Sequence, residues 1–146
     1  MRIFFCLLLT VVLLSACAGK RPANLGVHNG LLADCPGTPN CVNSQATDES
    51  HSIASLSYSG DKKDAFLRLK KIIESEKRTR IITESEAYLH VEFTSMIMGF
   101  VDDVEFYFPD EPLIHVRSAS RLGSSDLGVN RKRVERLREL FSGKSG

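Results

Sequence analysis

Hydrophobic and polar residues alternate with a period of two along three consecutive segments in the second half of the chain. These segments are 87–95, 100–108 and 113–119, and shorter strand-like segments precede them at 52–58 and 80–83. Such alternation is typical of antiparallel strands that bury one face of a sheet and leave the other face in water. The pattern therefore predicts an antiparallel sheet of about four to five strands.

Two further segments have helical periodicity. The first follows Asp61, a residue type that commonly caps helices, and runs to about Lys77. The second begins near 128–130. Apolar residues recur at helical spacing along both segments: Ala65, Phe66, Leu69, Ile72, Ile73, then Val134, Leu137 and Phe141. Two amphipathic helices packed on one face of the sheet give an α+β fold, and we expect a single such domain over 34–146.

The N-terminal residues differ in composition from this domain. Arg2 precedes an apolar run over 3–14, which is shorter than the ~20 residues of a membrane-spanning helix. The sequence Ser-Ala-Cys that ends at Cys17 resembles the bacterial lipobox, in which small residues precede a cysteine that becomes the acylated N-terminus. An ordinary secreted protein cleaved nearby is the alternative.

From this resemblance we expect a lipoprotein signal peptide over 1–16 and a lipid anchor, palmitate included, on Cys17. Glycine, proline and asparagine are frequent in the following residues, so a flexible tether is predicted over 17–33. The residue after the cysteine is Ala18 and not aspartate, which by resemblance to Gram-negative lipoproteins implies an outer-membrane anchor that faces the periplasm.

The net charge of the chain is +1, and removal of the signal peptide with Arg2 would make it zero. No overall positive field therefore favours nucleic acid as a partner. The expected partners are the membrane, through Cys17, and an anionic envelope ligand or a protein.

Two cysteines, Cys35 and Cys41, lie in the sequence CPGTPNC. In an oxidising compartment such a pair predicts a disulfide. A metal site with His28 or His51, or a reactive thiol pair, is the alternative.

Cations, hydroxyls and glycines are concentrated at 117–135, between the last predicted strand and the last helix. A helix N-terminus beside several arginines favours phosphate or carboxylate. The candidate ligand-binding residues are Arg117, Ser118, Ser120, Arg121, Asp126, Asn130, Arg131 and Arg133. The competing interpretation is a capped helix whose arginines pair with nearby acids.

The predicted outer face of the sheet carries a second group of ionisable residues. A divalent metal or an acid–base pair would use His90, Glu92, Asp103, Glu105 and His115. The competing interpretation is cross-strand pairing of Arg117 with Glu105 or Glu92. Asp102 falls on the buried side of its strand, where Arg121 or Arg131 is the expected partner. No cofactor other than this weaker metal alternative is predicted.

Several long strings, in order, resemble the bacterial and plastid domain-of-unknown-function family 1499. They are CPGTPNCVNSQ, His51, GFVDDVEFYF and HVRSASRLGSSDLGVNRKRVERL, which extend from about Cys35 to the last helix. The resemblance supplies no catalytic residues. Some members carry a membrane segment, and this chain resembles a lipoprotein version.

Together these observations predict a cell-envelope lipoprotein that binds an anionic ligand or a partner without catalysing a reaction. A metal-dependent or acid–base enzyme acting on an envelope substrate is one alternative. A purely structural role, in which the charged strings serve folding, is the other.

Overall fold

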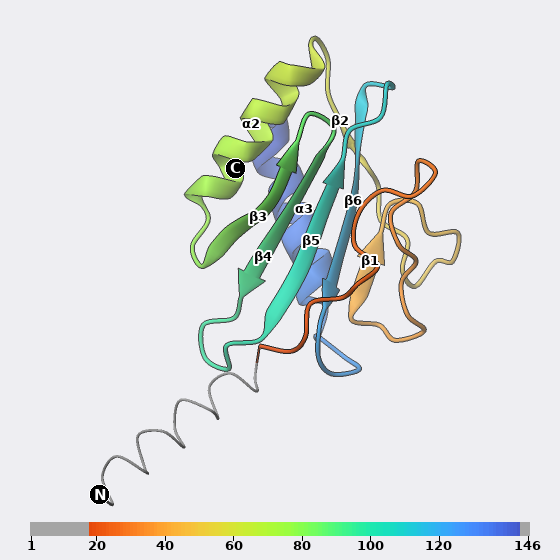
Figure 1. Cartoon of the computed structure of the whole chain (residues 1–146), viewed down its shortest axis with the longest axis vertical. Helices are drawn as coiled ribbons and strands as arrows, with labels where there is room; N and C mark the ends of the chain where they lie inside the picture. Colours follow the sequence, from red (N-terminus) through yellow and green to blue (C-terminus); the bar gives the residue numbers. More distant parts are fainter. Residues whose placement is uncertain (1–17, 144–146) are drawn as a thin grey trace, which may run out of the picture.

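The computed structural model describes residues 18–143, which form a six-stranded antiparallel sheet with two helices. The strands are β1 (Cys41–Asn43), β2 (Leu56–Ser57), β3 (Thr79–Ser85), β4 (Tyr88–Thr94), β5 (Val101–Tyr107) and β6 (Leu113–Ser120). Their order is β1-β6-β5-β4-β3, and β2 pairs with the other end of β6 (Figure 1). The predicted α+β architecture is confirmed, with more strands than the four to five expected.

The helices α2 (Lys62–Ser75) and α3 (Val129–Ser142) contribute to one hydrophobic core with one face of the sheet. The side chains that form this core come from every layer: Val42, Leu56, Phe66, Leu69, Ile73, Leu89, Val91, Val104, Phe106, Phe108, Ile114, Val116, Val134, Leu137 and Phe141. The rings of Phe66 and Phe108 lie 5.1 Å apart between centroids and join α2 to the end of β5. Burial of these apolar side chains is the main stabilising contribution to the fold.

Local side-chain bonds define where each helix begins. Asp61 Oδ1 accepts hydrogen bonds from the backbone N–H groups of Lys63 and Asp64, at 2.8 and 3.2 Å, so it is the predicted cap of α2. At the start of α3, Asp126 accepts from the backbone N–H groups of Gly128 and Asn130. Gly128 has a φ of 77°, a left-handed conformation that favours glycine.

The strand predicted at 52–58 is wrong in extent, because only Leu56–Ser57 pairs as β2. The strand β1 was not predicted. It has three residues, all buried, and its middle residue Val42 alone reaches the core. A strand this short, buried on both sides, has no alternation to detect.

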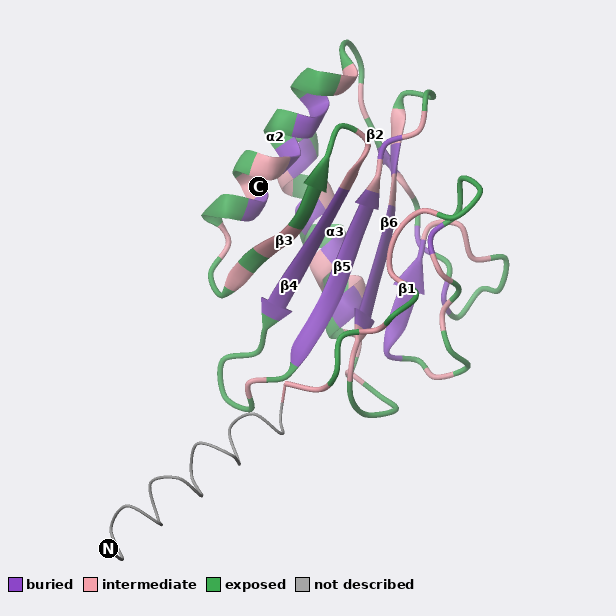
Figure 2. Ribbon diagram, viewed as in Figure 1, coloured by how far each residue is buried: buried purple, intermediate pink, exposed green. Residues whose placement is uncertain are grey.

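The second face of the sheet is also buried, which corrects the expectation of a single buried face. Figure 2 shows β1, β4, β5 and β6 mostly in the colour of buried residues. Residues 18–34 lie across this face, near β5, β6 and β1 (Figure 1). We call this segment the N-terminal strap. It covers the polar side chains, whose alternation had suggested exposure to water.

A flexible tether was expected over 17–33, but residues of the strap make defined contacts with the sheet. Arg21 bonds to Glu92, and the backbone N–H of Gly26 donates to Glu105 at 2.8 Å. Neither helix in residues 18–143 is long and apolar enough to cross a membrane. The predicted signal peptide over 1–16 and the lipidated Cys17 lie outside the described residues.

Candidate functional site

The polar face of the sheet carries a cluster of charged side chains beneath the strap. Strand register places Glu92 opposite Asp103 and His90 opposite Glu105. Arg121, which follows the end of β6, reaches back across β5 to this cluster. We call Arg21, His90, Glu92, Asp103 and Arg121 the polar cluster.

Arg121 is the centre of the polar cluster. Its Nε and Nη2 donate to the two carboxylate oxygens of Asp103, each at 2.8 Å, and Nη2 also bonds Glu92. His90 Nε2 lies 2.8 Å from Asp103 Oδ1. This paired geometry raises the pKa of Arg121, chiefly through the hydrogen bonds that it donates to Asp103, although burial opposes the shift.

The two carboxylates of the polar cluster are held ionised. Burial alone would raise the pKa of Glu92, but hydrogen bonds from Arg21 and Arg121 outweigh it and lower the pKa to about 2. For Asp103 burial also acts to raise the pKa, and hydrogen bonds from Arg121 and His90 bring it below its usual value. Carboxylates with such low pKa values are poor general bases near neutral pH.

Glu105 forms a second group of bonds beside the polar cluster. Its Oε1 accepts from Tyr88 Oη at 2.7 Å and from the N–H of Gly26, and its Oε2 accepts from Arg117 at 3.3 Å. Burial, together with the charge of Glu105, raises the pKa of Tyr88. Of the two partners that the competing interpretation gave for Arg117, Glu105 is the one bonded, on a face that is buried and not exposed to water.

Arg117 is buried but less completely satisfied than Arg121. Its Nη2 makes a long contact of 3.5 Å with the carbonyl of Asp34 in the strap. Its Nε is the one buried side-chain nitrogen or oxygen without a hydrogen-bond partner in residues 18–143. The strap covers this arginine, so the side chain does not present a free cation to solvent.

His115 lies apart from the other residues of the predicted metal set. Its ring stacks on Tyr107, and its Nδ1 is 3.2 Å from Ser44 Oγ. Burial lowers the pKa of this imidazole. In the part of the chain that the structure describes, no three histidine, cysteine, aspartate or glutamate residues are arranged to hold a metal ion. The predicted set His90, Glu92, Asp103, Glu105 and His115 is therefore divided between ion pairs and a separate histidine.

The predicted ligand-binding stretch is divided between both faces of β6. Arg117 and Arg121 point to the polar face, whereas Ser118, Ser120 and Asn130 lie on the helix side. The Asn130 side chain is buried and bonded to residues of four segments: Asn40, Ser118, Ser120, Asp126 and Arg133. We call these residues the Asn130 hub. The members of the hub satisfy one another's hydrogen-bonding groups. The hub therefore links β1, β6 and α3.

The expected partner of Asp102 is wrong. Arg133 on α3, and neither Arg121 nor Arg131, bonds Asp102, at 2.5 Å between Nη2 and Oδ2. Arg131 instead donates to the backbone carbonyls of Ser50 and Ser52. Residues three apart lie on the same face of a helix, so Arg133 lies beside Asn130 on α3, where it reaches Asp102 at the start of β5.

The predicted disulfide between Cys35 and Cys41 is confirmed, with the Cα atoms 5.7 Å apart. His51, one of the alternative metal ligands, has other partners. Its Nδ1 lies 2.7 Å from Asp48 Oδ1 and its Nε2 lies 3.0 Å from the carbonyl of Thr38. Hydrogen bonding from Ser50 is the largest cause that lowers the pKa of Asp48, to about 2.

Four residues of these networks were missed from the sequence: Arg21, Gly26, Asn40 and Tyr88. Arg21 and Gly26 stand in a segment rich in residues that favour loops, which carries no periodic signal. Tyr88 could have been placed on the polar face, because it is two residues before His90 in the same strand.

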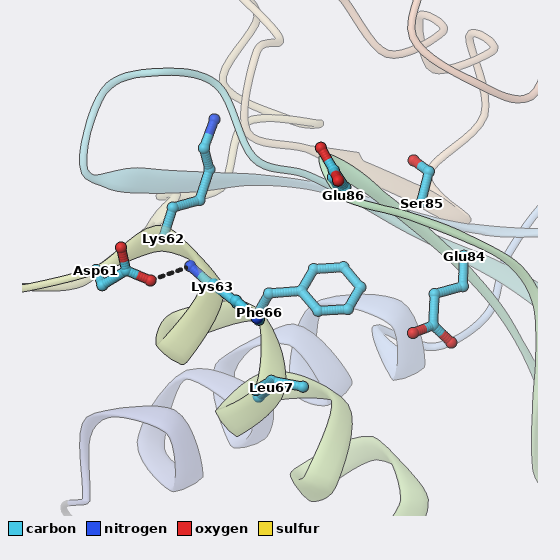
Figure 3. Close-up of a pocket in the computed structure, with 8 residues that line it drawn as sticks. All are labelled: Asp61, Lys62, Lys63, Phe66, Leu67, Glu84, Ser85 and Glu86. Carbon is cyan, nitrogen blue, oxygen red and sulfur yellow. Dashed lines mark hydrogen bonds between the residues drawn. The ribbon is translucent and has the colours of Figure 1, made fainter.

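A large open pocket lies away from both networks, between the start of α2 and the turn that joins β3 to β4. It has a volume of about 780 Å³, within the range of ligand pockets. Phe66 and Leu67 face it from the helix, and 84–86 line the opposite side (Figure 3). Lys62 and Lys63 add positive charge beside Glu84 and Glu86. We call this pocket the α2–β3 groove.

These features define a class of protein: a small α+β domain with helices on one sheet face and an N-terminal strap over an ion-paired second face. The chain belongs to the family described as proteins of unknown function (DUF1499), whose sequence model matches residues 31–141. A search of curated proteins found no match to the chain.

Proposed function

We propose that the protein is a lipid-anchored cell-envelope protein that binds a partner without catalysing a reaction. The polar face of the sheet is the observation that supports a role without catalysis. Its carboxylates and arginines pair with one another, as Arg121 does with Asp103 and Arg117 with Glu105, and the strap covers them. An acid–base centre would instead need a side chain of suitable pKa that faces a cavity.

The anchor part rests on the lipobox-like sequence at Cys17. Cys17 directly precedes the strap, so an acyl chain there would attach the domain closely to the bilayer. The test is full-length Cys17→Ser expressed beside wild-type protein in Gram-negative cells. The variant should lose acyl-chain labelling, whereas wild-type protein should keep it. Equal labelling of the two proteins, or no labelling of either, would contradict the anchor.

For partner binding, the α2–β3 groove is favoured over the arginine-rich stretch. The arginines at 117, 121 and 133 bond acidic side chains, so an anionic ligand would have to displace these partners. In the groove, Leu67 is half exposed, and positively charged lysines and negatively charged glutamates lie beside it. An apolar floor with mixed charge suits a polypeptide segment better than a simple anion.

Photocrosslinking in cells tests this assignment. A photoreactive residue at Leu67 or Glu86 should give a discrete crosslinked product, and the same residue at Glu135, on the exposed side of α3, should not. Leu67→Asp combined with the probe at Glu86 should abolish the product. A product that persists in this variant, or that forms equally from Glu135, would contradict binding in the groove.

A further inference from the structure

Large apolar side chains are exposed mainly at one end of the molecule. Of the nine that are exposed within the described residues, seven lie there: Met96, Ile97, Met98, Phe100, Leu122, Leu127 and Val129. They belong to the loop between β4 and β5, the loop between β6 and α3, and the first residue of α3. Both loops lie at the lower end of the sheet in Figure 1. We call this surface the apolar end.

The two loops form one continuous surface. The N–H of Arg121 donates to the carbonyl of Val101 at 3.1 Å, which joins the bases of the loops. A pocket of about 190 Å³ lies between them, and Phe100, Leu122 and Val129 are among its lining residues. A contiguous exposed apolar surface, unlike scattered single residues, indicates an interaction site.

The most exposed side chains of this end have no role in the core. Ile97 is 85% exposed and Leu127 is 86% exposed. Leu127 also has a φ of 54°, a left-handed conformation that is unusual for a bulky residue. A bulky apolar side chain held in solvent in this conformation suggests a contact outside the domain.

The chain enters the domain at this same end. Gly19 packs so closely on the loop after β6 that an added Cβ would lie 2.9 Å from Arg121 Cβ and 3.0 Å from Leu122 Cγ. Cys17 is two residues earlier, and two residues span at most ~7 Å. A lipid on Cys17 would therefore hold a bilayer directly beside the apolar end.

Basic side chains lie beside the apolar end. Lys20, Lys77 and Arg78 are exposed, and the carbonyl of Arg78 accepts from the N–H of Thr94 at the base of the β4–β5 loop. Of the acids nearby, Asp126 is bonded to Asn130 and Asp102 is bonded to Arg133. An apolar end with exposed cations beside it complements an anionic bilayer surface.

From these observations we propose that the apolar end inserts into the interfacial layer of the bilayer that holds the Cys17 anchor. The domain would then stand with the sheet extending away from the membrane and with the α2–β3 groove at the end far from the bilayer. This inference rests on the lipid anchor of the proposed function, and it adds a second membrane contact and a fixed orientation.

Tryptophan fluorescence in vesicles tests the orientation, because the chain has no tryptophan of its own. Full-length Ile97→Trp and Leu67→Trp are produced in cells with their own N-terminus and reconstituted into phosphatidylethanolamine–phosphatidylglycerol vesicles with brominated acyl chains. These positions are matched, since both are exposed apolar residues at opposite ends. Brominated lipid should quench Ile97→Trp at least twofold, relative to unbrominated lipid, and leave Leu67→Trp unchanged.

Flotation of the same vesicles separates the anchor from the orientation. If the protein floats with the vesicles and both tryptophans are quenched equally or not at all, the anchor holds and the membrane contact is overturned. If it does not float, the anchor itself fails, and the inference fails with it. If Ile97→Trp shows a concentration-dependent blue shift and sediments as a dimer in detergent without lipid quenching, a second copy covers this end and the inference is wrong. Leu127→Trp, in the neighbouring loop, should behave as Ile97→Trp does.

Discussion

Arg21 and Glu92 are 71 residues apart in the sequence, and their side chains are bonded in the folded protein. Arg21 Nη2 and Nε donate to Glu92 Oε1 at 2.5 and 3.1 Å. Arg121 bonds the same oxygen. The Glu92 carboxylate on β4 therefore links the strap to the residue that follows β6. This relationship makes the segment after the proposed lipid anchor part of the folded domain.

Replacement of Arg21 by alanine should loosen the strap with little effect on the core. The Arg21 side chain is 44% exposed, so solvent screens its ion pair, and the free energy of unfolding should fall by only about 1 kcal/mol. Hydrogen exchange should show a larger effect: the N–H of Gly26, which donates to Glu105, should exchange faster in Arg21→Ala.

Lys20→Ala is the matched control, because Lys20 is an exposed neighbouring cation. It should leave the exchange of Gly26 at the wild-type rate. If Arg21→Ala and Lys20→Ala give the same exchange at Gly26, Arg21 does not hold the strap.

Acid should destabilise the protein through the polar cluster. The folded-state pKa of Glu92 is about 2, below its usual 4.5, and the pKa of Asp103 is also lowered. The folded protein thus binds fewer protons than the unfolded chain in this range. The stabilisation is complete above about pH 4.5 and is lost as the pH falls toward 2. For Glu92 it should be on the order of 2 kcal/mol.

Urea unfolding followed at intervals between pH 6 and pH 2.5 checks this expectation. Wild-type stability should decrease across the interval, and Glu92→Gln should have lower stability at pH 6 with a shallower decrease. Glu135→Gln, which alters an exposed acid on α3, should retain the wild-type slope. Parallel curves for wild type and Glu92→Gln would mean that Glu92 does not contribute to the acid sensitivity.

Periodicity in the sequence predicted the helices and long strands, because apolar positions such as Val104 and Phe106 report the buried face directly. The partner Glu105 for Arg117 was also predictable, since cross-strand neighbours share a face. Alternation did not reveal that the second face is covered. Charged residues at every second position are compatible with water or with a network of ion pairs beneath another segment.

The strap itself could not be predicted from local pattern. Its contacts depend on Arg21 and on the N–H of Gly26, a backbone group that every residue except proline provides. Most residues of the Asn130 hub were predicted as ligand contacts and not as a buried network, for a similar reason. Ser118 and Asn130 are ordinary surface residue types, and their burial follows from the packing of α3 on β6.

The pair between Asp102 and Arg133 should stabilise the attachment of α3. Both side chains are mostly buried, and Arg133 also lies over the ring of Phe93 at 4.8 Å. Asp102→Asn would leave the arginine beside a neutral group, so we expect a loss of about 1–3 kcal/mol in the free energy of unfolding. Arg131→Gln, whose partners are backbone carbonyls at the surface, should cost less than 1 kcal/mol.

A double-mutant cycle of Asp102→Asn and Arg133→Gln isolates this pair. The double variant should be less destabilised than the sum of the single variants by about 1 kcal/mol or more. Additive effects would show that the two residues act independently, and would leave the hydrogen bonds of Arg133 with the Asn130 hub as its main contribution.

The disulfide should stabilise the edge of the sheet at β1. It closes a loop between residues six apart, and Cys41 is buried opposite Ala119. Beside it, the carbonyl of Asn40 accepts from the N–H of Ser120 at 3.0 Å. Loop closure over so short a segment contributes on the order of 2–3 kcal/mol, and reduction should lower the free energy of unfolding by about that amount.

Unfolding of wild-type protein with and without dithiothreitol measures this contribution, and amide exchange at Ser120 reports whether the loss occurs at β1. The variant with both Cys35→Ser and Cys41→Ser should match reduced wild-type protein and should not respond to dithiothreitol. If that variant does respond, another thiol is responsible. If reduction leaves the exchange at Ser120 unchanged while stability falls, the bridge acts on the unfolded chain alone, and β1 is held by its pairing with β6 and by the Asn130 hub.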